Sequence, residues 1–508
     1  MKKFLRERRR IIFIFTPVAI GLLYFLLCAV NLRQSVWLNE SYGAYLTHFD
    51  FGKIWELSAA NGYSPLYFFV LKIWAHFFGH GAAAMRVMSI LFGALAIMFA
   101  FLWVKFKYGG TAAIVASLML AISPAMVHYG QEIQPFAMIA MIVFAATYFL
   151  QLAIDHGKTY WWVLYGILIT AGLWTHYLCV LAWLAHIVYL LMIYGKKVLQ
   201  KKIVLVYLSA IILSLPCLVR LTIQTSAAEI SIANVASYWS EMLVYTPADA
   251  TKGWAMVLCL IVALMTTGLA VYCHKKLKML TAMAAIPVVL LMVFSMPLFR
   301  IPFAAGSIPF AVTAFCAMEG VLIVLFSREV LKPKKARKKV RFYQQPILAV
   351  CASILLLIGA SICGLGSVYA YGNYDFSTNK KPTAKDLYDN IAVLDNYQGL
   401  PVIANTEWLY YDLSTYSSDE LPVFFIDELI DYKYGVQEPL KQSYFGKISN
   451  LDKYLGKHSA VWFVGIEPEV GTDLEFPRAG WRITTHSNLQ FDDRGERYQI
   501  LKLEKDPI

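Results

Sequence analysis

The chain has 508 residues, of which 59% are apolar and only 15% are charged. Soluble domains carry about 25% charged residues, so this composition excludes an ordinary soluble protein and predicts a polytopic membrane protein. The net charge of +12 does not indicate a nucleic-acid binder, because the basic residues form short clusters between apolar runs instead of one continuous basic face.

The first predicted element is an apolar run over residues 11–30, which follows a basic N-terminus at residues 1–10. A run of about 20 apolar residues is long enough to cross the hydrocarbon core, and no small-residue cleavage site follows it. We therefore expect a retained membrane span with its basic end in the cytoplasm. Further runs of spanning length lie at residues 85–104, 111–128, 135–154, 160–177, 178–195, 202–222, 253–273, 279–297, 303–327 and 346–369.

Residues 65–79 form a shorter apolar segment, which contains Lys72 and His76. A segment of about 15 residues is either a short span or a helix that lies along the membrane surface. The positive-inside rule decides between them, because only a surface helix leaves the later basic clusters in the cytoplasm. The sequence thus predicts about 11 spans in a transmembrane domain over residues 1–370, whose first extracytoplasmic loop covers about 31–84.

Residues 371–508 follow the last predicted span and have the composition of a soluble protein. Short β-like runs lie at 401–404, 422–426, 460–465 and 497–503, and a helix-compatible stretch lies at 385–396. This alternation predicts a small extracytoplasmic α/β domain. The predicted fold class is therefore a polytopic α-helical membrane protein with a C-terminal α/β domain.

Polar side chains gather at the predicted outer face, where charge is costly at membrane level and therefore indicates function. Glu40 follows the first span and has no basic neighbour in the sequence to neutralise it. Glu132 and Gln134 follow the third span, and His176 lies between the fifth and the sixth. Plainer alternatives stay open, with Glu132 as a helix cap, His176 as a packing residue and Lys72 as a side chain that reaches the surface.

Five short motifs lie in a fixed order along the predicted membrane domain. They read Trp37-Leu38-Asn39-Glu40, Tyr63-Ser64-Pro65-Leu66-Tyr67, Arg86 at the start of a span, Ala121-Ile122-Ser123-Pro124 with Gln131-Glu132-Ile133-Gln134-Pro135-Phe136, and Thr175-His176-Tyr177. Their order and the predicted topology resemble the GT-C membrane glycosyltransferases, especially the family 39 protein O-mannosyltransferase and aminoarabinose-transferase-like group. The resemblance covers roughly residues 10–330.

The sequence departs from the family pattern at several motif positions, one of which is Tyr63, where the family has a histidine. The first acid of the family's acidic pair, usually assigned as the catalytic base, is Asn39 here. Ser64 stands where the family has a proline, and Gln134 stands where it has an arginine. Three explanations stay open, namely that Glu40 has taken over as base, that the substrate differs, or that the protein is no longer catalytic.

The resemblance implies transfer of a hexose, mannose in the type family, from a polyprenyl-phosphate-linked donor to an acceptor hydroxyl, with inversion at the anomeric carbon. The acceptor would be a glycan, a lipid or a protein. Glu40 is then the candidate general base beside Asn39. Arg300, near the outer end of the ninth predicted span, is the preferred group to stabilise charge on the departing phosphate, and Lys72 and His176 are also available.

The remaining predicted site residues would bind or position substrate. Glu132 with Gln134 would hold the acceptor or the surface loop, and Tyr63 and Tyr67 would stack on a sugar ring or pack the surface helix. We expect no metal, because Asn39 removes one of the few carboxylates at the site. The eight cysteines lie in apolar segments without CxxC spacing, so no zinc site or disulfide framework is predicted either.

Two other classes of function compete with a transferase. A transporter is disfavoured because the sequence shows neither inverted repeats nor charges at the membrane midplane. A noncatalytic, degenerate GT-C scaffold that acts as a cell-envelope binding or assembly protein is favoured by Asn39 and Gln134. The sequon Asn39-Glu40-Ser41 favours a bacterial plasma membrane, because glycosylation there would block the presumed site.

Overall fold

The computed structural model describes residues 2–60, 64–219, 274–294, 308–330 and 383–426, together with shorter stretches. The shorter stretches are 358–359, 361–366, 368–369, 440, 445–466, 474–476, 478–490 and 497–506. Tyr63 and Arg300, two of the predicted site residues, lie outside the described residues. The predicted span at 253–273 and much of the span at 346–369 lie outside them as well.

The chain forms two compact units, each built from two separate stretches of sequence. One unit combines Met1–Leu32 with Val87–Ala370, and the other combines Arg33–Arg86 with Tyr371–Ile508. The segment that the sequence predicts as the first extracytoplasmic loop therefore groups with the C-terminal residues. The placement of the two units with respect to a membrane, and a domain boundary between residues 370 and 371, stay predictions.

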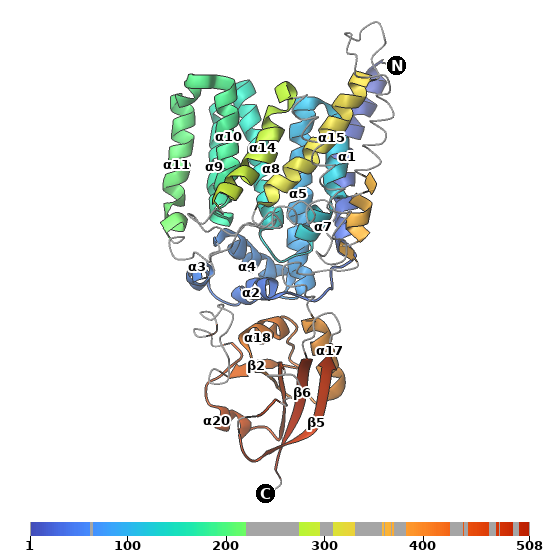
Figure 1. Cartoon of the computed structure of the whole chain (residues 1–508), viewed down its shortest axis with the longest axis vertical. Coiled ribbons are helices and arrows are strands. Elements are labelled where there is room, and N and C mark those ends of the chain that lie inside the picture. Colours follow the sequence, from blue (N-terminus) through green and yellow to red (C-terminus); the bar gives the residue numbers. More distant parts are fainter. Residues whose placement is uncertain are drawn as a thin grey trace. The chain divides into compact units, whose positions relative to one another are not determined.

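The first unit is a bundle of apolar helices (Figure 1). Its elements are α1 (Lys2–Ala29), α5 (Ala82–Tyr108, whose first turn belongs to the second unit), α6 (Gly110–Ala121), α7 (Pro124–Gly130), α8 (Phe136–His156), α9 (Thr159–Thr175), α10 (Cys179–Tyr194), the 3-10 turn η1 (Gly195–Leu199), α11 (Lys201–Leu218), α14 (His274–Phe294) and α15 (Pro309–Val330). Apolar runs form helices in lipid because a helix satisfies its own backbone hydrogen bonds.

Three of the helices that the structure describes are long and apolar enough to cross a membrane, namely α5, α8 and α11. A fourth candidate is the pair α6 and α7, which is bent by 62°. The bend falls where Ser123 adopts an extended conformation and Pro124 has no N–H to continue the helix. The uninterrupted run expected at 111–128 is therefore a broken helix, and the total of about 11 spans stays a prediction.

The predicted surface helix corresponds to the 13-residue helix α4 (Leu66–Phe78) in the second unit. Tyr67 and Leu71 are buried along one side of α4, whereas Phe77 and Phe78 are exposed. Thirteen residues of helix extend only about 20 Å, which is less than the roughly 30 Å of a hydrocarbon core. The same segment of sequence also forms α2 (Leu38–Leu46) and α3 (Phe51–Ala60).

The C-terminal part of the second unit contains a β-sheet (Figure 1). The sheet has six strands in the order β3-β2-β1-β4-β6-β5. The strands are β1 (Val402–Ala404), β2 (Val423–Ile426), β3 (Lys447–Ile448), β4 (Ala460–Ile466), β5 (Trp481–Gln490) and β6 (Arg497–Lys505), and the helices are α17 (Ala384–Asp395), α18 (Glu407–Ser414) and α20 (Leu451–Leu455). Strands β1 to β4 pair in parallel, and β6 runs antiparallel to β4 and β5. The predicted α/β character of this segment is confirmed.

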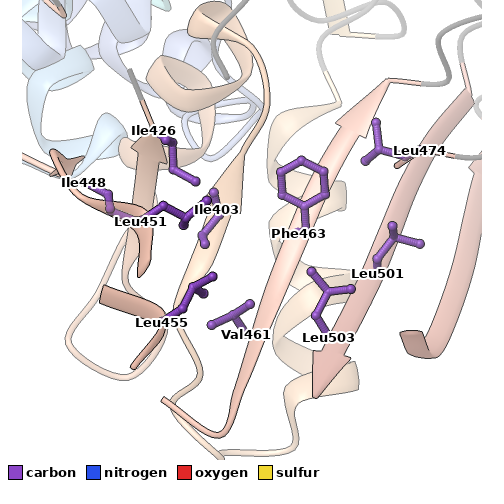
Figure 2. Close-up of a cluster of buried hydrophobic side chains, with 10 residues drawn as sticks. All are labelled: Ile403, Ile426, Ile448, Leu451, Leu455, Val461, Phe463, Leu474, Leu501 and Leu503. Atoms are coloured by element: carbon purple, nitrogen blue, oxygen red, sulfur yellow. The ribbon is translucent and has the colours of Figure 1, made fainter. Parts of the chain in front are cut away.

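One face of this sheet carries a cluster of buried apolar side chains (Figure 2). Ile403 of β1, Phe463 of β4 and Leu501 of β6 lie in the cluster, and Leu451 and Leu455 of α20 cover it. Alternate residues of a strand point to the same face, so the period of two in β4 and β6 produces this core. Helix α18 also packs against β1 and β2, and it contacts α2, where the site described next begins.

Candidate functional site

The site begins at the N-terminus of α2, where the chain turns from an extended conformation into a helix. Trp37 is the N-cap residue, with φ −97° and ψ 160°. Glu40 is the third residue of the helix, and its Oε2 accepts the backbone N–H of Trp37 at 3.3 Å. A glutamate at this position satisfies an N–H group that has no partner within the helix, as in a capping box.

Glu40 forms a buried, bidentate ion pair with Arg86 of α5. Arg86 Nε donates to Glu40 Oε1 at 3.0 Å, and Arg86 Nη2 donates to Glu40 Oε2 at 2.8 Å. The side chain of Glu40 is only 2% exposed, and that of Arg86 is 0% exposed. The paired geometry uses the planar fork of the guanidinium, which a lysine does not offer.

The same guanidinium fixes the backbone that precedes α2. Arg86 Nη1 donates to the carbonyl of Gln34 at 2.6 Å, and Nη2 donates to the carbonyl of Ser35 at 3.1 Å. Arg86 thus joins the start of α5 to the chain before α2 and to the helix itself. A buried arginine needs such partners, because an unpaired buried charge is strongly destabilising.

Glu40 has no basic neighbour in the sequence, but the expectation that its charge is not neutralised is wrong. Its partner Arg86 is distant in the sequence and is brought beside it only by the fold. Both carboxylate oxygens of Glu40 are engaged, and the residue is 1% exposed. In this arrangement Glu40 has no open face toward an acceptor hydroxyl, whereas the adjacent Asn39 is exposed.

Lys72 lies near two histidines of the same unit, His48 and His80. Its Nζ donates to the carbonyl of Thr47 at 3.0 Å, and the hydroxyl of Thr47 bonds to Nδ1 of His80 at 2.8 Å. His80 stacks on His48 with ring centroids 4.6 Å apart. Burial lowers the pKa of His48 to about 4, and His80 and Lys72 lower it further in the same direction. This pair of imidazoles is therefore neutral beside the ammonium group at neutral pH.

Tyr67 was expected either to stack on a sugar ring or to pack the surface helix. The side chain is fully buried in α4, and its ring meets that of Phe68 edge to face at 5.5 Å. Tyr67 therefore packs against its own helix, and its predicted stacking on a sugar ring stays a prediction.

Glu132 and Gln134 belong to the other unit, in the turn between α7 and α8. Glu132 pairs with His128 at 3.0 Å. The N-cap of α8 is Pro135, so the plainer alternative that Glu132 caps this helix does not hold. Gln134 is 5% exposed. In the same turn, Gln131 Nε2 donates to the carbonyl of Cys28 at 3.0 Å, which ties the turn to α1.

His176 lies at the break between α9 and α10. Its Nδ1 accepts the N–H of Leu178 at 3.2 Å, and its ring stacks on Tyr177 with centroids 4.8 Å apart. These contacts stabilise the helix break, and the predicted role of His176 in binding the donor phosphate stays a prediction.

The predicted site residues are thus divided between the two units. Glu40, Asn39, Lys72 and Tyr67 lie in the unit that contains the sheet, and the others that the structure describes lie in the helical bundle. Within the described ranges, no group of three or more His, Cys, Asp or Glu side chains is arranged to hold a metal ion. The expected lack of a cofactor stays a prediction.

Comparison with solved structures identifies the class of the fold. ArnT from Cupriavidus metallidurans in the apo state is 14% identical and superposes with a TM-score of 0.57 over 95% of this chain and 97% of that one. The same protein bound to undecaprenyl phosphate is 13% identical and gives a TM-score of 0.58 over 96% of this chain and 97% of that one. The chain therefore has the fold of ArnT, which is a GT-C glycosyltransferase.

A narrower match concerns the central part of the chain. Residues 63–219 match the family model described as dolichyl-phosphate-mannose-protein mannosyltransferase. No curated protein matches the chain by sequence. The matched residues include Arg86, Glu132 and His176, which carry three of the five motifs, so this match and the fold agree with the resemblance found in the sequence.

Proposed function

We propose that the protein is a glycosyltransferase that moves a sugar from a polyprenyl-phosphate carrier to an acceptor hydroxyl at the extracytoplasmic face of the cell membrane. The observation that carries this proposal is the similarity of fold to ArnT over nearly the whole of both chains, since one of those structures is bound to undecaprenyl phosphate. A lipid-linked donor presents its head group at the membrane surface, where an amphipathic helix such as α4 lies when it binds a membrane.

The departing group in such a reaction is a phosphate, which needs cationic or hydrogen-bonding stabilisation as charge develops. Lys72 supports this role best among the described residues, because its ammonium group is only partly buried and has neutral imidazoles beside it. Arg300 and His176 remain the other proposed groups for the phosphate. Glu132 with Gln134 remains the proposed pair that positions the acceptor or a loop.

The geometry favours a positioning role for Glu40 over the predicted role as general base. A base needs a carboxylate oxygen within hydrogen-bond distance of the acceptor hydroxyl, and both oxygens of Glu40 are bonded to Arg86. The ion pair instead holds α2 and the residues before it in one conformation. Loss of Glu40 is then expected to lower transfer through misplacement of the loop and not through loss of a proton acceptor.

A second candidate function is favoured by a specific observation. Asn39 occupies the position of the family's catalytic acid and is exposed, while the neighbouring carboxylate is paired. A GT-C scaffold with this pair of residues fits a noncatalytic protein that binds a lipid-linked or envelope glycan. The two functions differ in whether sugar is transferred, so one assay separates them.

The test measures transfer of radiolabelled sugar from polyprenyl-phosphate-hexose by membranes that contain the wild-type protein, Glu40→Gln or Arg86→Gln. We expect transfer by the wild type and a similar loss in both variants, because either change breaks the same ion pair. The matched control is Glu56→Gln, the same substitution at an exposed glutamate of α3. Loss in Glu40→Gln with full activity in Arg86→Gln would restore Glu40 as the base. No transfer by a folded, membrane-inserted wild type from any carrier tested would refute the transferase and favour the binding protein.

A further inference from the structure

The C-terminal residues contact α2 directly. Helix α18, which follows β1, packs against α2 within the second unit. Tyr42 and Tyr45 of α2 meet Tyr411 of α18 with ring centroids 5.9 Å and 5.1 Å apart, and all three rings are buried. Tyr45 also meets Tyr410 at 5.8 Å. Buried aromatic contacts of this kind fix the relative position of two helices.

Hydrogen bonds from the C-terminal residues reach the backbone and side chains on both sides of Glu40. The hydroxyl of Tyr416 accepts the N–H of Val36 at 2.9 Å, and the N–H of Lys385 donates to the hydroxyl of Ser35 at 3.0 Å. On the other side, the hydroxyl of Ser41 donates to a carboxylate oxygen of Asp412. Each of these bonds joins residues of the N-terminal segment 33–86 to residues of the C-terminal segment.

Tyr416 also lies close to the ion pair itself. Burial raises the pKa of its hydroxyl to about 12, and the positive charge of Arg86 opposes that rise. The carbonyl of Ser35 accepts a hydrogen bond from Arg86, and the hydroxyl of Ser35 accepts one from the N–H of Lys385. The contacts of Arg86 and the contacts of the C-terminal residues therefore converge on the same short turn, residues 34–37.

We propose that Asp412 and Tyr416 are positioning residues, through which the C-terminal domain holds the turn 34–37 and α2 in the conformation that lets Arg86 meet Glu40. The C-terminal domain is then a structural part of the site and not a separate module for binding an acceptor. The effect of this positioning on transfer rests on the proposed function, whereas its effect on α2 does not.

The first measurement is hydrogen exchange in the full-length protein in membranes, which needs no substrate. Tyr416→Phe keeps the ring and removes only the hydroxyl. Asp412→Ala removes the acceptor of the Ser41 hydroxyl from the C-terminal side and leaves in place the contact of that hydroxyl with the carbonyl of Trp37 at 3.1 Å. Each variant is expected to speed the exchange of amides in residues 34–46 about fivefold, the effect of losing one hydrogen bond. Amides of β1, β4 and β6 are expected to exchange as in the wild type, which shows that the domain remains folded.

The matched controls are Tyr397→Phe and Asp386→Ala, which change an exposed tyrosine and an exposed aspartate of the same domain. Unchanged exchange at residues 34–46 in both Tyr416→Phe and Asp412→Ala, with the controls also unchanged, would overturn the proposal. This result is independent of whether the wild type transfers sugar.

The second measurement is the kinetics of transfer in the assay described above. Misplacement of α2 is expected to lower kcat severalfold at an unchanged KM for the acceptor, because no binding contact to the acceptor is removed. A raised acceptor KM with unchanged kcat would instead make the C-terminal domain a recognition module and would overturn the positioning role. If the wild type transfers nothing, the proposed function fails, and the hydrogen-exchange result alone decides the inference.

Discussion

Replacing Glu40 by glutamine is predicted to destabilise the second unit, because it leaves Arg86 buried without its counter-charge. The two side chains are almost fully buried and share two hydrogen bonds of 3.0 Å and 2.8 Å. Removal of one partner from a buried pair costs about 3–5 kcal/mol of unfolding free energy. Glutamine keeps the shape of glutamate and one acceptor oxygen, so we expect a loss near the lower end, about 3 kcal/mol.

The assay is thermal unfolding of the purified chain in detergent, followed by tryptophan fluorescence. A loss of 3 kcal/mol lowers Tm by about 6–12 °C at the ratio typical of units with 150–250 residues. Arg86→Met is expected to cost as much or more, because the carbonyls of Gln34 and Ser35 lose their donor as well. The double variant is expected to cost less than the sum of the two by at least about 1 kcal/mol, because it leaves no unpaired charge.

The control is the pair formed by Lys53 and Glu56 on α3, which has a similar length of 3.0 Å but side chains that are 31% and 63% exposed. Exposed pairs contribute little, so Glu56→Gln is expected to change stability by less than about 0.5 kcal/mol. If Glu40→Gln unfolds at the same temperature as Glu56→Gln, the ion pair does not hold the loop, and the positioning role of Glu40 is refuted.

Two further predictions concern other parts of the chain. Burial, together with His80 and Lys72, lowers the pKa of His48 to about 4 in the folded protein. The histidine of the unfolded chain, with an ordinary pKa of about 6.5, therefore binds more protons below that pH, and stability falls as the pH drops from about 6.5 to 4. His48→Gln is expected to lose less stability than the wild type when the thermal midpoints at about pH 7 and pH 5 are compared, and equal losses would contradict this cause. A Cβ on Gly320 of α15 would lie 2.4 Å from the Ala116 Cα of α6, so Gly320→Ala is expected to destabilise the bundle by about 1–3 kcal/mol. Gly366→Ala, where the added atom meets nothing within 4 Å, is the control in the same unfolding assay, and equal stability of the two variants would show that α6 and α15 separate without cost.

The secondary structure was largely predictable from the sequence because it depends on local pattern. The runs at 401–404, 422–426, 460–465 and 497–503 correspond to β1, β2, β4 and β6, and the stretch 385–396 corresponds to α17. Strand β5 was missed because its sequence, WRITTHSNLQ, is mostly polar and lies at the edge of the sheet, where one side needs no apolar residues. Strand β3 is too short to produce a pattern.

The candidate site was predictable only in part. The motifs singled out Glu40 and Arg86 but gave them no relation to each other. The burial of Tyr67 could not be predicted, because the helical period of buried positions is not visible in a segment that is apolar throughout. The contacts of His176 with Leu178 and of Glu132 with His128 are now known, and the functional roles of both residues stay predictions.

The sequence by itself determined that the chain is rich in long apolar helices and ends in an α/β segment, because apolar length, charge clusters and strand patterns are properties of contiguous residues. Only the tertiary structure decided that Arg86 neutralises Glu40 and that Asp412 and Tyr416 reach the turn before α2. Such pairs join residues far apart in the chain, and their energy depends on the exclusion of water and on distances of a few ångströms, which no local pattern records.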